Sequence, residues 1–185
     1  MNNVNIIILI IAIILLLLSI SIIIYKSFME KINIIISKID DSNNEYNDKL
    51  LEKHNLVLEL IKIVETKYKI DSKTLNDLKK VKEDKIISQE NEKLLNKCYK
   101  EIIDIKEDNK KQRETKAFKQ ILNDYEETDL YLVSLRTYYN KYTLLYNNMI
   151  SKFPYNIICK FKKLNIKSLI EGKELDNDFN NDLEV

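Results

Sequence analysis

Few residues of this chain belong to the types that perform chemistry in active sites. His54 is the only histidine, so a single chain cannot build a histidine-based triad or a multi-histidine metal site. The two cysteines, Cys98 and Cys159, lie far apart, without CxxC spacing or a neighbouring histidine, and therefore indicate neither a zinc site nor a disulfide scaffold. We interpret both cysteines as small apolar helix residues and His54 as a residue on the surface or flank of a helix.

Carboxylates are frequent, but they are scattered among lysines on the faces of predicted helices. Neighbours such as Glu126 and Glu127 point in different directions on a helix and do not form a catalytic pair. The 30 basic and 29 acidic residues give a net charge of +1, whereas a nucleic-acid partner favours a basic surface. We therefore expect a protein that is not an enzyme and that has no cofactor, no metal ion and no nucleic-acid partner.

The scarcity of glycine and proline decides the fold class. Gly172 is the only glycine and Pro154 the only proline. Tight β-hairpins and phosphate-binding loops depend on glycine, whereas helices form without it. The sequence therefore predicts an all-α fold.

An apolar stretch near the amino terminus predicts a transmembrane helix. Residues 6–24 read IIILIIAIILLLLSISIII, and sixteen of these nineteen are Ile or Leu. At roughly −0.3 to −0.6 kcal/mol each, they favour membrane insertion by about 5 to 10 kcal/mol in total. As a helix the stretch spans about 28 Å, close to the thickness of the hydrocarbon core. Residues 1–5 lack Lys and Arg and residues 22–25 are bulky, which argues against a cleaved signal. We expect an uncleaved, single-pass anchor from about residue 5 to 25, with the lipid bilayer as a partner.

The lysines near this stretch predict its orientation. The amino-terminal flank has no Lys or Arg, whereas Lys26, Lys31 and Lys38 follow the stretch. Positive charges close to the membrane resist translocation. We therefore expect the amino terminus outside the cell membrane and the rest of the chain in the cytoplasm.

A heptad pattern typical of a coiled coil predicts one long helix that ends at Pro154. Its stripe is apolar at all but one position and must pack against other helices. The positions are Phe118, Ile121, Tyr125, Thr128, Leu132, Leu135, Tyr139, Tyr142, Tyr146, Met149 and Phe153.

The remaining pattern predicts an antiparallel, up-and-down bundle. The transmembrane helix should continue into the first bundle helix, with a weak point at 41–44, where helix propensity is low. Asp71 and Ser72 offer an N-cap for the second helix, and Ser88 is the expected N-cap of the third. The predicted helices cover 26–69, 72–84, 88–110 and 115–152; the alternative is three helices, with 72–110 continuous.

The chain after the bundle divides into a basic and an acidic part. Residues 154–170 mix apolar side chains with lysines, and Lys160, Lys162 and Lys163 are candidates for contact with a membrane surface. The alternative is that the apolar residues pack on the open end of the bundle while the lysines stay in water. Residues 171–185 are acidic and predicted to be disordered. The chain is thus expected to divide into four parts. Residues 1–25 form the amino-terminal segment with its anchor, and residues 26–153 form the helical bundle. Residues 154–170 form the basic and apolar segment, and residues 171–185 form the acidic tail.

A repeated pair of Tyr and Asn, one heptad apart, leads into a Phe-Pro-Tyr-Asn sequence. This pattern resembles the carboxy-terminal signature of the LemA family, and the resemblance covers most of residues 45–160. It implies a membrane-anchored bacterial protein with a helical-bundle domain and no established biochemical activity. From their heptad spacing, we expect the motif residues to serve the core and register of the bundle or, at an exposed edge, to bind a partner. The motif residues are Tyr139, Asn140, Tyr146, Asn147, Phe153, Pro154 and Asn156.

Taken together, these features predict a non-enzymatic platform near the membrane for another membrane or cytoplasmic protein. The alternative is a sensory or signalling stalk that relays a signal through a continuous anchor helix.

Overall fold

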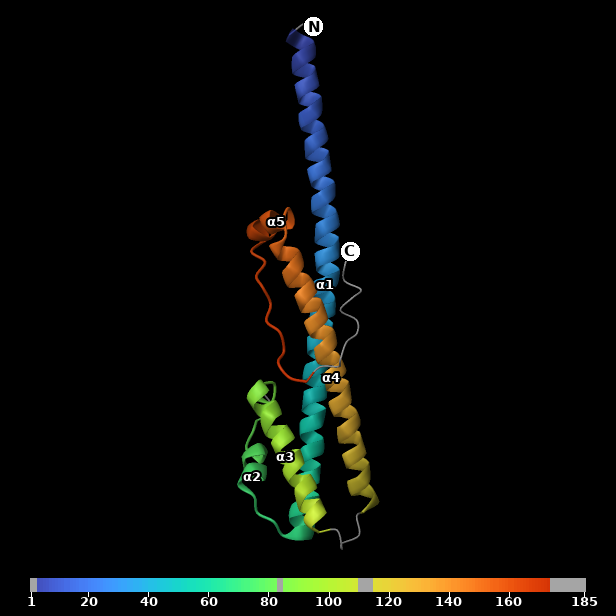
Figure 1. The fold of residues 1–185 in the computed structure, drawn as a ribbon, viewed down its shortest axis with the longest axis vertical. Coiled ribbons are helices and arrows are strands. Elements are labelled where there is room, and N and C mark those ends of the chain that lie inside the picture. The colour runs from blue at the N-terminus through green and yellow to red at the C-terminus, as the bar shows by residue number, and fades with distance from the viewer. Residues whose placement is uncertain (1–2, 83–84, 110–114, 174–185) are drawn as a thin grey trace. The chain divides into compact units, whose positions relative to one another are not determined.

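The computed structural model describes residues 3–82, 85–109 and 115–173, and all regular structure in these ranges is helical, which confirms the all-α fold. The chain divides into two compact units. The first unit comprises Met1–Asp40 with Asn140–Leu169, and the second comprises Asp41–Tyr139 with Ile170–Val185. The helices are α1 (Asn3–Tyr68), α2 (Lys73–Lys79), α3 (Gln89–Asp108), α4 (Lys116–Ser151) and α5 (Tyr155–Lys162) (Figure 1).

Helix α1 has 66 residues and contributes to both units. Its apolar amino-terminal part is long enough to cross a membrane, and none of its most apolar window is buried in the protein. The helix continues through residues 41–44, where we expected a weak point. Ile39 and Tyr46, on either side of that stretch, are both buried. Tertiary packing thus outweighs the poor helix propensity between them.

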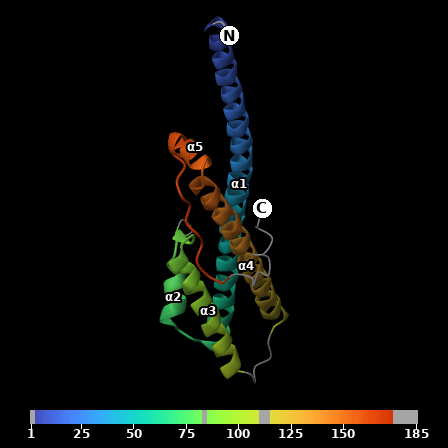
Figure 2. The ribbon, with the colours of Figure 1, turned by 45° about the horizontal axis from the view of Figure 1, so that its top comes forward.

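In the second unit, four helical segments enclose one hydrophobic core. Lys53 and Tyr46 on α1 contact Asp129 and Arg136 on α4, respectively, so α1 and α4 run antiparallel. Helix α3 lies alongside the carboxy-terminal half of α1 in both ribbon views, and the chain direction alternates from α1 to α4 (Figures 1 and 2). The up-and-down bundle is therefore confirmed for this unit. Its buried core residues are Tyr46, Leu50, Val57, Leu60, Ile61, Val64, Leu75, Leu78, Ile86, Leu95, Cys98, Ile102, Phe118, Leu122, Tyr125, Leu132 and Leu135.

The second helix is shorter than predicted. Helix α2 has seven residues and ends at Lys79, whereas we expected a helix over 72–84. Leu75 and Leu78 fill its buried face, and the connection that follows buries Ile86 instead of continuing the helix. Helices α2 and α3 are separate, so the alternative with 72–110 continuous is wrong.

The expected N-caps differ in how they act. Ser88 caps α3 as predicted, because its side-chain oxygen accepts a hydrogen bond from the Asn91 backbone N–H at 3.2 Å. Ser72 occupies the N-cap position of α2 without a side-chain capping bond.

The buried stripe on α4 ends before Phe153, the last position of the predicted heptad pattern. Tyr146 is 2% exposed, but Phe153 is 78% exposed, so the prediction that Phe153 belongs to the core is wrong. Helix α4 ends at Ser151, and the chain then turns through Pro154 into α5. Leaving the helix takes Phe153 off the stripe that its heptad position predicted.

The first unit contains a short helix that the sequence pattern did not define. Helix α5 lies within the predicted basic and apolar segment 154–170. Its first residue, Tyr155, stacks on Phe28 of α1 with 4.6 Å between ring centroids. From residue 174 on, the predicted acidic tail lies outside the described residues.

Candidate functional site

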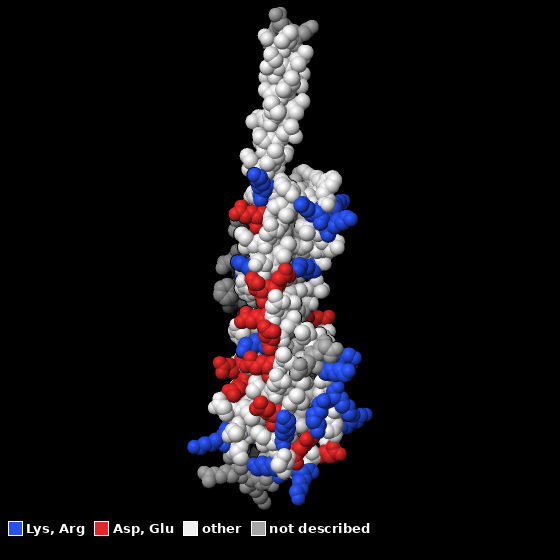
Figure 3. Space-filling view, turned by 180° about the vertical axis from the view of Figure 1, so that it is seen from behind, with Lys and Arg blue, Asp and Glu red and all other residues white. Residues whose placement is uncertain are grey.

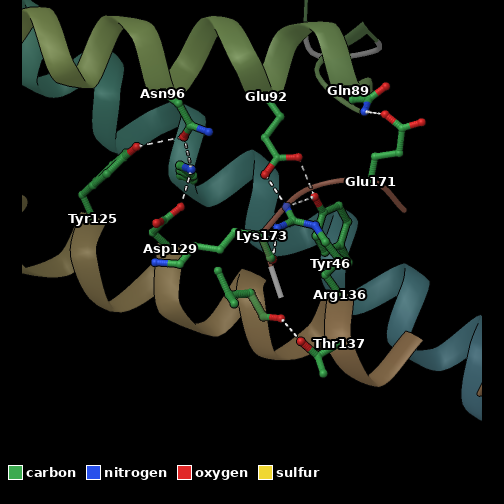
Figure 4. A network of polar contacts seen from close by, with 12 residues as sticks. Tyr46, Gln89, Glu92, Asn96, Tyr125, Asp129, Arg136, Thr137, Glu171 and Lys173 are labelled. Carbon is green, nitrogen blue, oxygen red and sulfur yellow. Dashed lines mark hydrogen bonds and ion pairs between the residues drawn. The ribbon is translucent and has the colours of Figure 1, made fainter. Parts of the chain in front are cut away.

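A buried ion pair joins three helices of the second unit. Arg136 on α4 is 2% exposed and pairs with the carboxylate of Glu92 on α3. The same guanidinium nitrogen, Nη2, donates to the Tyr46 hydroxyl at 2.9 Å, and that hydroxyl donates to Glu92 at 2.8 Å. Figure 4 shows the three side chains converging from α1, α3 and α4. The triangle fixes these helices at one level of the bundle.

A second buried cation lies in the same unit. Lys53 on α1 is 0% exposed, and its Nζ lies 2.5 Å from Asp129 and 2.6 Å from the Asn96 side-chain oxygen. Nζ also lies 5.1 Å from the centre of the Tyr125 ring, and the Tyr125 hydroxyl donates to Asn96 at 3.3 Å. A buried charge is costly unless it is paired, and the Lys53 ammonium is engaged by the carboxylate, the amide oxygen and the aromatic ring.

The segment after residue 169 is held against Arg136. Arg136 Nη1 donates to the main-chain carbonyl of Lys173 at 2.6 Å. Gly172 has φ of +140°, and a Cβ there would lie 2.7 Å from Arg136 Cζ. Both the backbone conformation and the close approach require glycine, which explains the single glycine of the chain. A cleft of about 310 Å³ opens beside this contact and is lined by Gln89, Glu92, Lys93, Asn96, Asp129, Val133, Arg136, Glu171, Gly172 and Lys173.

Burial determines the protonation of the groups around these cations. It raises the pKa of the Tyr46 phenol to about 12, more than the hydrogen bond from Arg136 lowers it. Burial also raises the pKa of Tyr99 to about 12, and it raises that of Tyr125. The pKa of Cys98 is raised by burial to about 11. The phenols and the Cys98 thiol are therefore protonated at neutral pH, and Cys98 lacks the thiolate that a nucleophile needs.

A larger, open groove lies between α1 and α4 of the second unit. Its volume is about 680 Å³, and its lining consists of Glu45, Lys49, Glu52, Asp124, Glu127, Thr128, Leu130, Tyr131 and Ser134. Leu130 is 65% exposed and Tyr131 41%. Across the described residues 3–82, 85–109 and 115–173, no group of three or more His, Cys, Asp or Glu side chains is arranged to hold a metal ion.

In the first unit, two motif residues hold the chain that returns from α5. The Asn147 amide donates to the Lys167 carbonyl at 2.9 Å and accepts from the Lys167 N–H at 2.9 Å. The Tyr146 hydroxyl donates to the Asn165 carbonyl at 3.1 Å. This pair of neighbouring motif residues therefore attaches the chain at residues 165 and 167 to α4.

The other residues named from the sequence are distributed along α4 and α5. Asn140 is buried, Tyr139 is half-buried, and Phe153 is exposed. Pro154 immediately precedes α5, and the backbone N–H of Asn156 donates to the Lys152 carbonyl at 2.9 Å. The exposed lysines Lys160, Lys162 and Lys163 lie at the carboxy-terminal end of α5.

Sequence reasoning missed the two buried cations and misplaced the histidine. His54 is 4% exposed, so its predicted place on a helix surface or flank is wrong. A signal was present: Leu50 and Val57 are seven residues apart, and a core-facing position must lie between them, at Lys53 or His54. Charged residues are assigned to the surface by default, which hid this position.

Comparison with known proteins agrees with the motif. The model of the LemA family matches residues 42–181, which cover most of the chain and all of the Tyr-Asn signature. Neither a curated protein nor a solved structure matches the chain. The extent of the family match shows that this chain belongs to the LemA family.

Proposed function

We propose that this protein is a non-enzymatic, single-pass membrane protein whose helical bundle is a binding platform for another membrane or cytoplasmic protein. One observation carries the anchor: residues 6–24 of α1 are exposed around the whole helix, and none of the residues that the structure describes covers them. An apolar surface of this extent is unfavourable in water and favourable in lipid. The same helix continues into the bundle, so the platform is joined directly to its anchor.

The charges that follow the apolar stretch support a cytoplasmic bundle. Lys26, Lys31 and Lys38 follow it, and no basic residue precedes it. Trypsin added to sealed right-side-out vesicles should leave the bundle intact, whereas trypsin added to inverted vesicles should digest it. Digestion in the right-side-out vesicles alone would reverse the orientation.

The buried cations support a structural rather than a catalytic bundle. Arg136 and Lys53 are each engaged by a carboxylate from another helix, and both connect helices within the core. Turnover of a substrate by the purified full-length protein would overturn this part of the proposal.

The platform itself is tested at the larger groove. A photoreactive amino acid at Leu130, which lines the groove, should crosslink to one discrete partner in membranes. The matched control is the same amino acid at Ile87, an apolar residue that is 55% exposed and not part of the groove lining. Equal crosslinking from both positions, or none from Leu130, would contradict a partner site in the groove.

The continuity of α1 favours a second candidate, a stalk that relays a signal along the helix. Replacing Asn43 and Asn44 by glycine would loosen α1 between its two parts at a cost of roughly 1 kcal/mol or less per residue. A platform should keep its crosslink from Leu130 in this variant. Loss of the crosslink, with the protein still in the membrane, would favour the stalk.

A further inference from the structure

We propose that α5 and the residues flanking it form a second membrane contact, which lies flat in the headgroup layer of an anionic leaflet beside the anchor. The proposal rests on the anchor proposed above and adds a lipid-binding surface to it. It concerns only the first unit, in which α5 and the amino-terminal part of α1 lie together.

The stacking of Tyr155 on Phe28 sets the level of α5 relative to the anchor. The uncharged stretch 6–24 ends at Ile24, and Phe28 follows four residues later, about 6 Å along the helix axis. The polar layer on each side of a bilayer is about 5 to 8 Å thick. Because Tyr155 is the first residue of α5 and stacks on Phe28 at 4.6 Å, the helix begins within that layer.

Helix α5 and the residues flanking it expose large apolar side chains, which no described part of the chain covers. Phe161 is 85% exposed, Phe153 78%, Ile166 72% and Ile157 49%. The side of α5 that faces the protein buries Cys159. In the alternative considered above, these apolar residues would pack on the open end of the bundle, but their exposure in the structure does not support such packing. Their number within one short segment calls for an apolar environment outside the protein.

The charge around these residues selects anionic lipid. Lys152, Lys160, Lys162 and Lys163 are exposed, and residues 153–170 contain no acidic residue. Lys167 is excluded from this set because it pairs with Asp40 at 3.0 Å. Figure 3 shows Lys and Arg side chains just below the uncharged surface of the apolar helix, with acidic side chains beside some of them. Basic residues with aromatic and aliphatic neighbours are typical of segments that bind an anionic membrane surface.

The absence of tryptophan from the sequence allows a site-specific test in the full-length protein. Single tryptophans are introduced as Phe161→Trp for the proposed contact, Ile22→Trp for the anchor and Leu130→Trp as an exposed control in the second unit. Each variant is reconstituted into vesicles of brominated phosphatidylcholine, with or without an equal amount of phosphatidylglycerol. Bromine on the acyl chains quenches tryptophan only where the side chain reaches the lipid.

The expected pattern separates the two proposals. In the anionic vesicles, Ile22→Trp and Phe161→Trp should both lose most of their emission, whereas Leu130→Trp should keep it. Replacing Lys160, Lys162 and Lys163 by Glu should restore the emission of Phe161→Trp and leave that of Ile22→Trp quenched.

Three results would count against these proposals. If Ile22→Trp is quenched while Phe161→Trp behaves like Leu130→Trp, the second membrane contact is overturned and the anchor stands. If Ile22→Trp is not quenched, the anchor itself is overturned. Quenching of Phe161→Trp that is the same in neutral vesicles and unaffected by the lysine replacements would overturn the selection of anionic lipid.

Discussion

At the scale of single residues, the buried cations of the second unit connect helices, and breaking one of their pairs should be costly. Arg136→Met leaves the Glu92 carboxylate without its partner in a site where Arg136 is 2% exposed. We expect a loss of about 3 to 5 kcal/mol in the free energy of unfolding, measured by denaturant titration in detergent. Adding Glu92→Met to this variant should recover most of the loss, because no unpaired charge then remains.

An exposed ion pair in the same unit provides the control. Lys49 and Glu52 lie 2.6 Å apart on one turn of α1, and both side chains are partly exposed to water. Lys49→Met should change the free energy of unfolding by less than about 1 kcal/mol. If Arg136→Met cost no more than Lys49→Met, Arg136 and Glu92 would not act as a buried pair.

The two bonds from Asn147 make a prediction about one backbone amide. Asn147→Ala removes the acceptor of the Lys167 N–H, which should exchange with deuterium on the order of tenfold faster. Asn147→Asp keeps an acceptor for this N–H and should protect the amide better than Asn147→Ala does. The control is Asn148→Ala, at the exposed neighbouring position. Equal exchange of the Lys167 amide in all these variants would show that Asn147 does not hold the returning chain.

At the scale of helices, the interior of α4 offers a matched pair of leucines. Leu132 is 0% exposed in the core, and Leu130, two residues away, is 65% exposed. Leu132→Asp should cost about 3 to 5 kcal/mol in stability because it places a carboxylate in an apolar site, whereas Leu130→Asp should cost less than about 1 kcal/mol. Thermal melting followed by circular dichroism measures both. Similar melting temperatures for the two variants would contradict the assignment of Leu132 to the core.

Long periodic patterns predicted the helices well, and short segments did not. The ends of α1 and α4 were predicted to within a few residues, because many apolar positions repeat at helical spacing along each of them. Helix α2 has seven residues and α5 has eight, too few for a period to be measured. Their boundaries depend on contacts with distant residues, such as the stacking of Tyr155 on Phe28.

The candidate site was predictable only in part, for a related reason. The motif identified Tyr146 and Asn147 as candidate residues. Their partners at residues 165 and 167 are main-chain atoms, which every residue type has, so the sequence pattern could not predict them. Arg136 and Lys53 are charged residues of the type that usually lies on the solvent-exposed face of a helix. Only the three-dimensional packing shows that both are buried.

At the scale of the whole molecule, the raised pKa values of the tyrosines predict loss of stability in alkali. The unfolded chain releases the phenolic proton of Tyr46 near its ordinary pKa of 10.0, whereas the folded protein retains it to about 12. Between these values the folded state holds more protons, so stability is full below pH 10 and falls as the pH rises to 12. The Tyr46 phenol should remove on the order of 1 kcal/mol per pH unit in this interval.

Urea titrations at several pH values from neutral to 12 would measure this fall. Tyr46→Phe should make the fall shallower, although the variant starts from a lower stability because the hydroxyl bonds to Arg136 and Glu92 are lost. Tyr138→Phe, at a residue that is 42% exposed, is the control. A stability curve of Tyr46→Phe that parallels that of the unmodified protein would rule out Tyr46 as a source of the alkaline effect.

Main-chain bonds hold three positions of the chain that follows α5, whereas side chains such as Lys167 and Glu171 add only exposed polar contacts, which contribute little. Asn165 and Lys173 each accept through a carbonyl, and Lys167 is bound by its N–H and its carbonyl. A main-chain hydrogen bond does not depend on which side chain the residue carries. In a comprehensive mutational scan, these three positions should therefore accept most amino acids, with proline excluded at 167 because it lacks the N–H. Gly172, which has no such freedom, should be the intolerant position in an otherwise permissive segment.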